Sequence, residues 1–534
     1  MSQHHDHEHH EHHDEQPKES TRDKRYWLSL EQWSEDPEFQ KLAEQEFASS
    51  PLREGDSEDG WARREFLKLM GASLAMATTG CIRRPVQKIV PYAKQPEEVT
   101  FQIPNFYTST YFDGSESIAL LVKTMEGRPL KIEGNPLHPV SKGGTSARAQ
   151  ASILSLYDPE RLSGPRKNLL NKTKTNRDTI HTKWEDMDKE AVKQLAKGGV
   201  VILTGAINSP STRQVIADFG TAFGARHIEW EPIGHEEIRD GQKAAYGEAI
   251  VPSYRFDKAK MIVSVDADFL GTWLTPVTFT KQFSSARKDI KNMNKLVAFD
   301  SGYSLTGANA DVRVRIKPSQ QLNVVMGLAH EIVVKKGQSR FASDSKAKAG
   351  LNSFADAAKD LNMDPALFSK VAEDLWANRG KSLVVAGGLP TLTAQAKDLQ
   401  LAVNFLNSVL ENDGATVDGK NAVPGLEGSY QALASLKADL ENGKVKTLII
   451  HRANPFYSLP ESFGFKDAVK KAAIVFYTGD RMDETGLFAD YVIPDNHPLE
   501  NWGDAEIGKG VYSIHQPTIR PMYDTRSFQF TLMN

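Results

Sequence analysis

Short apolar runs alternate with helical patterns through most of the chain, and this alternation limits the folds that it can adopt. Apolar runs of strand length occur at residues 200–204, 227–231, 261–265, 295–299 and 312–316, with helical patterns at 210–223 and 236–246. A second set has strands at 383–386, 447–450 and 474–477 and helices at 394–410 and 465–472. Repeated β–α units of this length predict doubly wound parallel sheets.

A different pattern precedes these units, in residues 120–150. Apolar and polar residues alternate on both sides of Glu126-Gly127, which predicts two short strands joined by a tight turn. Gly134-Asn135-Pro136 then ends the strand pattern, and Gly143-Gly144 keeps the following backbone in loop conformations. A β-hairpin followed by a rigid polar loop is the expectation for this part of the chain.

The sequence from residue 127 to residue 165, GRPLKIEGNPLHPVSKGGTSARAQASILSLYDPERLSGP, adds a resemblance. It is similar to the N-terminal signature of the molybdopterin oxidoreductase family, which includes formate dehydrogenases, nitrate reductases and polysulfide reductases. The resemblance implies an α/β fold like domains 1–3 of formate dehydrogenase and DMSO reductase. Such a fold has a small N-terminal β region and two doubly wound parallel-sheet domains.

In that family four cysteines around the hairpin hold one [4Fe–4S] cluster. The resemblance places the four positions at Tyr111, Gly114, Ile118 and Ser146, and the basic residue that follows the last cysteine at Arg148. None of the four positions carries a thiolate, and iron–sulfur clusters are built on cysteine thiolates. We therefore expect no cluster here, with Ser146 and Arg148 as remnants of the site.

The family's pterin-binding segments also have counterparts. Asn454-Pro455 followed by Leu459-Pro460 is similar to one of them, and ETGLFADYVIPDNHPLENWG, residues 484–503, is similar to another. The guanine-facing segment has become Pro318-Ser319-Gln320-Gln321, which lacks the family's glycine and acid, and Arg452 replaces a small residue or a glutamate. We expect no catalytic residue and no bound cofactor, and Asn454 and Glu484 are vestigial positions. Ligation of a metal by Ser or Asp stays open.

Acidic residues close to the predicted strand ends need another interpretation. Asp266, Asp268 and Asp483 are expected to cap loops or to form surface ion pairs rather than to take part in catalysis. Glu484 and Glu500 remain polar groups near the predicted sheet ends that could line a vestigial cavity.

Charge and cysteine content restrict the partners and the metal sites. The chain of 534 residues has a net charge of −4 and no extended basic stripe, which argues against nucleic acid as a partner. Its single cysteine, Cys81, excludes intrachain disulfides and multi-cysteine metal sites. No metal site is assigned to the folded domains.

The first 62 residues do not resemble the rest. Residues 1–25 include a histidine-rich stretch interleaved with acids, which predicts a disordered tail. Loose binding of zinc, nickel or copper by this tail and a merely solvated tail both remain open. Residues 26–62 contain an amphipathic segment that either docks on a partner or forms a cap.

Arg63 and Arg64 precede a short, weakly hydrophobic run that ends at Cys81. This pattern resembles a twin-arginine export signal, and the run is too short to span a bilayer. Cys81 resembles the lipidated cysteine of a bacterial lipoprotein, although Thr78 stands where such signals usually have leucine. Residues 63–81 therefore predict export of a folded protein, with Cys81 as the candidate for a lipid anchor.

The order of these features resembles one branch of the family, the molybdopterin-like, iron–sulfur subunit of alternative complex III, a bacterial quinol-oxidising complex. The resemblance implies a non-catalytic structural subunit at the periplasmic face of the inner membrane. Its partners would be a ferredoxin-like iron–sulfur subunit, a multi-span quinol-binding membrane subunit and a multihaem cytochrome c, which carry the [4Fe–4S] and [3Fe–4S] clusters and haem. The alternatives are an active molybdenum or tungsten bis-pterin oxidoreductase without the proximal cluster, and an unassembled remnant.

The same reading divides the chain into successive parts. Residues 82–165 form the small β region, 166–380 one α/β domain and 381–510 part of a second. Residues 511–534 resemble the approach to a C-terminal domain that is missing, as is the family member's ferredoxin-like half.

Overall fold

The computed structural model describes Pro37 and residues 99–112, 116–168 and 179–534. The histidine-rich tail, the amphipathic segment, Arg63, Arg64, Cys81 and Gly114 lie outside these residues, so the predictions for them are not tested. Apart from Pro37, the described residues belong to one compact unit, Lys94–Asn534.

An antiparallel sheet of three strands begins this unit. β1 (Asn105–Phe112), β2 (Ser117–Met125) and β3 (Arg128–Gly134) pair in the order β1-β2-β3. The predicted turn between β2 and β3 is confirmed: Glu126 and Gly127 have φ angles of 52° and 77°, as a two-residue hairpin turn requires. One face of the sheet packs against α4 (Ala147–Leu156) in a small apolar core.

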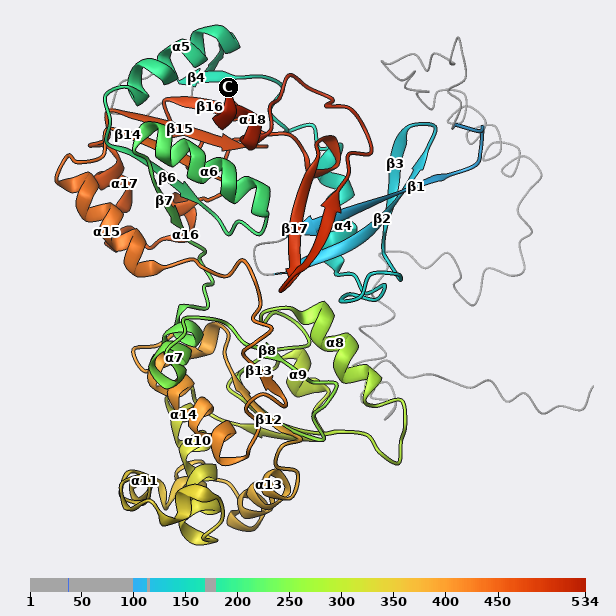
Figure 1. The fold of residues 1–534 in the computed structure, drawn as a ribbon, viewed down its shortest axis with the longest axis vertical. Coiled ribbons are helices and arrows are strands. Elements are labelled where there is room, and N and C mark those ends of the chain that lie inside the picture. Colours follow the sequence, from blue (N-terminus) through green and yellow to red (C-terminus); the bar gives the residue numbers. More distant parts are fainter. Residues whose placement is uncertain (1–36, 38–98, 113–115, 169–178) are drawn as a thin grey trace, which may run out of the picture. The chain divides into compact units, whose positions relative to one another are not determined.

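The larger of the two parallel sheets has seven strands in the order β5-β4-β16-β15-β14-β6-β7 (Figure 1). Five are parallel, namely β6 (Val200–Thr204), β7 (Arg226–Glu229), β14 (Thr447–His451), β15 (Ile474–Gly479) and β16 (Tyr491–Pro494). β4 (Arg166–Asn168) and β5 (Thr179–His181) extend one edge in antiparallel pairing.

Helices cover both faces of this sheet because both faces of its central strands are apolar. On one face, α5 (Trp184–Leu195), α6 (Pro210–Phe223) and the start of α18 (Phe528–Met533) pack on alternate strand residues, among them Ile202 and Ile449. The other face packs against α15 (Tyr430–Glu441) and α17 (Phe465–Val469) through Leu203 and Leu448. This is the doubly wound arrangement that the alternating pattern predicts.

The second parallel sheet has the order β11-β10-β9-β12. Its strands are β9 (Met261–Val265), β10 (Lys295–Asp300), β11 (Val312–Arg315) and β12 (Ser382–Ala386). One face carries α10 (Gln321–His330), α13 (Pro365–Ala377) and α14 (Ala396–Val409), and α7 (Glu236–Tyr246) packs on α14. The opposite face packs against α8 (Pro276–Ser285) in a cluster rich in aromatic residues.

The remaining elements are short. They are β8 (Ser253–Tyr254), β13 (Val417–Asp418), β17 (Gly503–Gly508), β18 (Val511–His515), α9 (Leu305–Ala308), α11 (Ser345–Leu351), α12 (Ala357–Asp360) and α16 (Pro455–Ser458), with 3₁₀ turns at Pro318–Gln320, Arg340–Ser343, Asn352–Phe354, Leu389–Thr391, Glu461–Phe463 and Pro498–Glu500 and a π-helical turn at Glu331–Lys335.

The strands do not group as the predicted division at residue 380 requires. β6 and β7 belong to the same sheet as β14–β16, and β12 lies beside β9 in the other sheet. The whole second sheet is therefore an insertion between β7 and β14. Each central strand is buried on both faces, so a local pattern shows that a strand exists but not which sheet it joins.

Residues 511–534 pack on the parts of the fold already described, and the predicted approach to a C-terminal domain is not tested. β18 pairs with β17, and Phe528 at the start of α18 is buried in the core of the seven-stranded sheet, where its ring stacks on His451 at 3.8 Å. This segment completes one face of the larger sheet.

Candidate functional site

Three of the four positions that correspond to the family's cluster ligands lie in an apolar core or at a helix terminus. Tyr111 on β1 and Ile118 on β2 are direct cross-strand partners, and Ile118 is fully buried beside Leu156 of α4. Ser146 is the N-cap of α4, where its hydroxyl accepts a hydrogen bond from the Ala149 N–H at 3.1 Å. These side chains stabilise the small β region and present no metal ligand towards one another.

A group of three adjoining cavities marks the candidate site. Their volumes are about 350, 550 and 390 Å³. The first two share Arg452, the first and third share Glu231, and the second and third share Arg148. Arg148, the basic residue after the last cysteine position, lies in the first turn of α4 and lines two of the three cavities.

The cavities lie where the strand order of the larger sheet predicts a ligand site. The chain runs from β6 outward to β7 on one side and from β14 outward to β16 on the other, so the order reverses between β6 and β14. In open α/β sheets, ligands bind at the carboxyl ends of the strands at this reversal. Gly205 after β6 and Arg452 after β14 both line the cavity of about 350 Å³.

The turn from β6 into α6 is the position where such folds bind the phosphates of a nucleotide, because the backbone N–H groups there attract anions. Here two carboxylates of the chain take that position. Glu231 accepts a hydrogen bond from the Ala206 N–H at 2.6 Å. Asp504 on β17 accepts from the hydroxyls of Ser209 and Ser211, the latter at 2.8 Å, and lies 3.3 Å from the Ser211 N–H. A phosphate would have to displace both acids.

Arg452 stands between the first two cavities. Its backbone has a φ of 48°, a strained region for a residue with a side chain, and its N–H bonds to the Thr478 carbonyl at 3.2 Å. The guanidinium pairs with Asp495 at 2.8 Å through one nitrogen and at 3.0 Å through Nε. Burial raises the pKa of Asp495, and the charge of Arg452 opposes this rise.

Asn454 and Glu484, the vestigial positions after β14 and β15, are brought together by the structure. The Asn454 amide donates to Glu484 at 2.7 Å and accepts from the Thr485 hydroxyl at 2.7 Å. Nearby, Asp483 accepts from the Tyr477 hydroxyl at 2.6 Å and from the Gly486 N–H at 2.7 Å. Burial raises the pKa of Asp483. Asp483 thus caps a loop, in line with the non-catalytic role expected for it.

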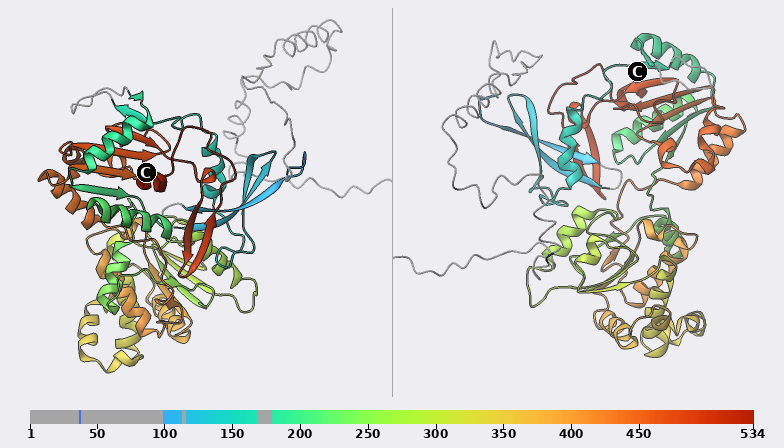
Figure 2. Two further views of the ribbon diagram at one scale, coloured as in Figure 1. Left: turned by 45° about the horizontal axis from the view of Figure 1, so that its top comes forward. Right: turned by 180° about the vertical axis from the view of Figure 1, so that it is seen from behind.

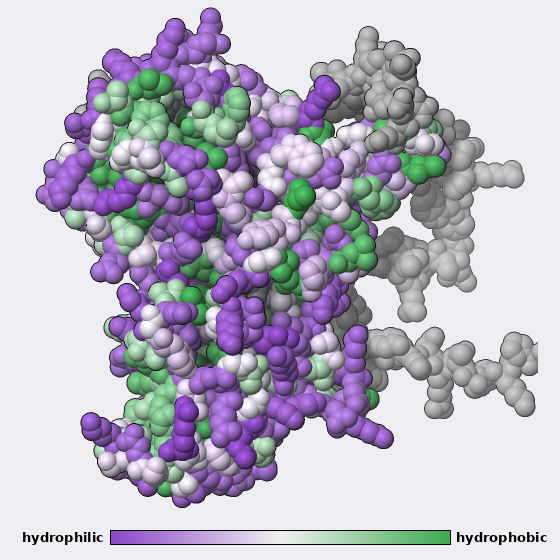
Figure 3. Space-filling model, viewed as in Figure 1, coloured by the Kyte–Doolittle hydropathy of each residue, from purple (hydrophilic) through white to green (hydrophobic). Residues whose placement is uncertain are grey.

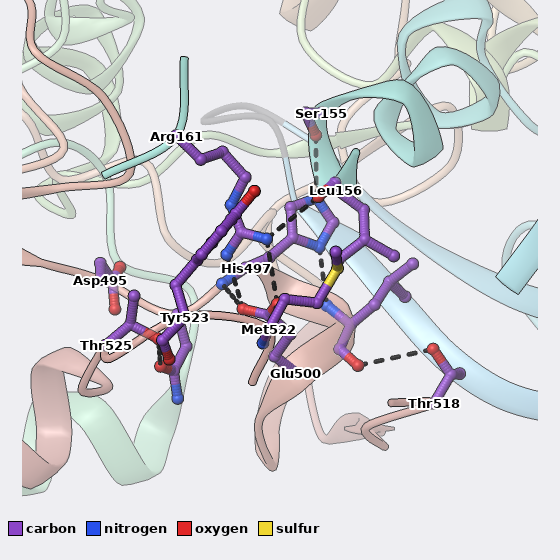
Figure 4. Close-up of polar contacts among 12 residues, drawn as sticks. Ser155, Leu156, Arg161, Asp495, His497, Glu500, Thr518, Met522, Tyr523 and Thr525 are labelled. Atoms are coloured by element: carbon purple, nitrogen blue, oxygen red, sulfur yellow. Dashed lines mark hydrogen bonds and ion pairs between the residues drawn. The ribbon is translucent and has the colours of Figure 1, made fainter. Parts of the chain in front are cut away.

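A Ser–His pair in the cavity of about 550 Å³ has the spacing of a nucleophile and its base but the wrong proton arrangement (Figure 4). His497 Nε2 lies 2.8 Å from the Ser155 hydroxyl. His497 Nδ1 accepts from the Leu499 N–H at 3.1 Å, so in the neutral ring the proton is on Nε2. Burial lowers the pKa of His497 to about 4. The ring therefore donates to Ser155 and cannot remove its proton.

Glu500 is not among the residues that line the three cavities. It forms a two-point ion pair with Arg161 at 3.0 and 2.6 Å, and both side chains are almost completely buried (Figure 4). The same carboxylate accepts from the N–H groups of His497 at 2.8 Å and Met522 at 3.1 Å. Its position is explained by Arg161, which follows α4 and requires a buried partner.

Acidic side chains outnumber basic ones around the three cavities. The acids in the lining are Glu231, Asp480, Asp483, Asp495 and Asp504, and the bases are Arg148 and Arg452. The histidines in the lining add no positive charge near pH 7, because burial lowers the pKa of His235, His497 and His515 to about 4 and that of His451 well below its ordinary value. Such a lining disfavours a ligand with several phosphates.

The corresponding strand ends of the second sheet are also occupied by the chain's own groups. Asp266 accepts from the Ser301 N–H at 2.7 Å and from the Gln321 amide, and Asp268 accepts from the Thr306 N–H at 2.9 Å. The indole of Trp273 lies where a Cβ on Gly387 would be placed, at 1.9 Å from Nε1. Gln321 is the position at which the family has its guanine-facing acid. The residues present therefore do not fit the bis-pterin cofactor that the family would bind.

Within the ranges 99–112, 116–168 and 179–534, no three His, Cys, Asp or Glu side chains are grouped closely enough to hold a metal ion. In the same part of the chain, every helix is too short or too polar to cross a bilayer.

Sequence reasoning finds Asn454, Glu484 and Arg148 but not the acids that fill the β6–α6 turn. Asp504 directly follows the segment 484–503 that resembles the family, yet nothing in the local sequence distinguishes it from a surface acid. Glu231 follows β7, and the sequence around it likewise gives no sign of a functional role. Both acids reach this turn through contacts between segments far apart in the chain, so no local sequence signal identifies them.

Comparison with known proteins agrees with this fold. Residues 200–528 match the family model described as molybdopterin oxidoreductase. The chain is 26% identical over 501 residues to the menaquinone reductase, molybdopterin-binding-like subunit of Nitratidesulfovibrio vulgaris, covering 87% of this chain and 70% of that protein. It is 22% identical to the molybdopterin-containing subunit ArrA of the arsenate respiratory reductase of Shewanella sp., covering 76% of this chain and 57% of that one.

Among solved structures, acetylene hydratase from Pelobacter acetylenicus has the same fold, with a TM-score of 0.60 and 13% sequence identity. The match covers 80% of this chain and 66% of the hydratase.

Proposed function

The chain belongs to the molybdopterin oxidoreductase family, and we propose that within it this protein is a structural subunit of a quinone-linked, membrane-bound respiratory complex rather than a catalyst. The observation that carries the proposal is the β6–α6 turn, where Glu231 and Asp504 accept the hydrogen bonds that a nucleotide phosphate would otherwise take. A fold that keeps its ligand position but fills it from within retains its shape and not its chemistry.

A relative that covers 87% of this chain supports the choice of complex. That protein is named as a menaquinone reductase subunit and as molybdopterin-binding-like. We propose that this chain belongs to a quinol-oxidising complex of the alternative complex III type. There it would brace a ferredoxin-like iron–sulfur subunit beside a multi-span quinol-binding subunit and a multihaem cytochrome c. Electrons would pass through the clusters and haems of these partners.

The location is part of the same proposal. Arg63 and Arg64 would direct export of the folded chain by the twin-arginine pathway, and Cys81 would carry the lipid anchor. The subunit would then act at the periplasmic face of the inner membrane, where a quinol-oxidising complex meets its soluble electron carriers.

Metal and pterin analysis of the native complex tests the central claim. The complex is solubilised from membranes, purified through a tag on this chain, and analysed for molybdenum, tungsten and released pterin per copy of the chain. We expect all three to be far below one per copy, with iron and haem from co-purifying subunits. Stoichiometric molybdenum or tungsten with extractable pterin would establish the alternative, an active bis-pterin oxidoreductase. A chain that purifies alone from the soluble fraction would contradict the assembly.

A further inference from the structure

The segment between α8 and β10 projects from the edge of the second sheet in all three ribbon views (Figures 1 and 2). All six of its tip residues, 288–293, are exposed. Ile290 at the tip has 83% of its surface exposed and Met293 has 45%. Ile290 and Met293 therefore place apolar surface at the end of a projecting loop.

Positive charge surrounds this apolar tip. Lys288 and Lys291 flank Ile290, and Lys281 on α8 and Lys258 before β9 are also exposed. The projecting edge is accordingly hydrophilic over most of its area (Figure 3).

The acids close to the tip do not cancel this charge. Asp289 is engaged within the loop, where it accepts from the Lys291 N–H at 3.1 Å and the Asn292 amide at 2.8 Å. Asp311 pairs with Arg287, and Asp374 pairs with Lys295 at 2.8 Å. Asp289 stays charged, because its hydrogen bonds come from neutral groups, so the two lysines and one aspartate of residues 288–293 leave a net charge of +1.

Hydrogen bonds fix both ends of this loop. The Lys260 ammonium donates to the Asn292 carbonyl at 2.7 Å, and Arg287 donates to the side chain of the buried Asn294 at 3.0 Å. Because both ends of the loop are fixed, Ile290 and Met293 are presented outward without a large loss of conformational entropy on binding.

We propose that this loop docks on a lipid bilayer that contains anionic headgroups. Ile290 and Met293 enter the boundary between headgroups and acyl chains, and Lys288 and Lys291 face the lipid phosphates. Six exposed residues are too small an area for a stable protein partner, which needs roughly 800 Å² on each side. They suffice for a membrane contact that adds to another anchor. This inference concerns the chain's own contact with lipid and does not depend on the proposed function.

A fluorescent label on the loop tests the proposal. The full chain with Cys81→Ser and Met293→Cys has a single thiol, which takes an environment-sensitive dye. We expect the emission of the dye to shift to the blue with phosphatidylcholine vesicles that contain phosphatidylglycerol, and to change little with phosphatidylcholine alone. The matched control carries the dye at Ser345→Cys, an exposed position at the start of α11. Its emission should not shift with either vesicle.

A second variant separates charge from insertion. Lys288→Gln/Lys291→Gln in the labelled chain should lower the affinity for the anionic vesicles, measured from the dye emission, roughly fivefold for each lysine removed. Lys346→Gln/Lys348→Gln on α11 removes the same charge elsewhere and should leave the response unchanged. A dye at residue 293 that stays in water while the chain binds vesicles would overturn the proposal, as would a response equal in both double variants. Neither outcome affects the metal analysis, so the two proposals fail separately.

Discussion

Arg452 and Asp495 form an ion pair at the carboxyl edge of the seven-stranded sheet, with 2.8 Å between the guanidinium and the carboxylate. The Asp495 side chain is 4% exposed, whereas the Arg452 side chain is 51% exposed and faces two cavities. Asp495 is thus the buried partner of Arg452, whose guanidinium lines the cavities at the ligand position of this fold.

Arg452→Ala should lower the free energy of unfolding by about 3 kcal/mol at pH 7.5, because it leaves Asp495 buried without its partner. Urea unfolding followed by tryptophan fluorescence measures the change. Arg452→Ala/Asp495→Asn should recover at least half of the loss, since the neutral amide needs no counter-ion. Equal destabilisation of the single and double variants would show that packing, not the unpaired charge, causes the loss.

Asp504→Ala should open the anion position at the start of α6. The loss of a carboxylate that caps this helix terminus should cost about 1 kcal/mol of stability. Sulfate or inorganic phosphate should then raise the melting temperature of the variant more than that of the wild-type chain, because an anion can bind the freed N–H groups. Asp398→Asn, in the first turn of α14, is the matched control. A variant that responds to these anions no more than the wild-type chain would contradict the assignment of this turn as an anion position.

Glu500→Ala should be the most damaging single change near the cavities. It leaves Arg161 buried without a counter-ion and should cost roughly 3–5 kcal/mol. Glu500→Gln should cost less, since its amide oxygen still accepts from the N–H of His497 or Met522. Chemical unfolding of both variants measures the difference, and equal losses would show that the ion pair is not the stabilising element.

The same pair has a defined pH dependence. Burial acts to raise the pKa of Glu500, but the hydrogen bonds from Arg161, His497 and Met522 outweigh it and hold the pKa below its ordinary value of 4.5. A depressed pKa gives stability that is present above 4.5 and is lost as the pH falls through the folded-state pKa. The gap between wild type and Glu500→Gln should therefore narrow below pH 4.5.

Local features of the fold could be predicted from the sequence, and long-range ones could not. The β2–β3 hairpin follows from Glu126-Gly127, because the turn is decided by the residues that form it. The strands at 200–204 and 447–450 are recognisable as buried runs, but their pairing joins segments far apart in the chain. α10 and α13 are not among the helices predicted from the sequence. Most residues of α10 are buried, so its sequence shows no clear polar face.

The candidate site divides in the same way. Asn454 and Glu484 belong to motifs that can be read along the chain, and they meet as hydrogen-bond partners. Asp504 lies 293 residues from Ser211, so only the fold brings the acid to the start of α6. For Ser146, the family pattern shows that a cysteine is absent at this position. Only the structure shows that Ser146 is the N-cap of α4.

Glu237→Gln should stabilise the chain in mildly alkaline solution. Glu237 lies in the first turn of α7, is 8% exposed, and its Oε1 is buried without a hydrogen-bond partner. Burial raises the pKa of Glu237 to about 7. The folded chain thus binds a proton between pH 4.5 and 7 that the unfolded chain has released, so this side chain's contribution is lost as the pH rises through 7.

The rise in the pKa of Glu237 sets the size of the expected change in stability. Wild type should lose roughly 3 kcal/mol from this group between pH 4.5 and pH 8, whereas the glutamine variant stays neutral throughout. We therefore expect equal stabilities near pH 5 and a more stable variant at pH 8, measured by urea unfolding at both values. Asp240→Asn, an exposed position on the same helix, removes a charge without burial and should change stability little at either pH. Equal stability of Glu237→Gln and wild type at pH 8 would contradict the claim that ionisation of the buried Glu237 carboxylate destabilises the folded chain.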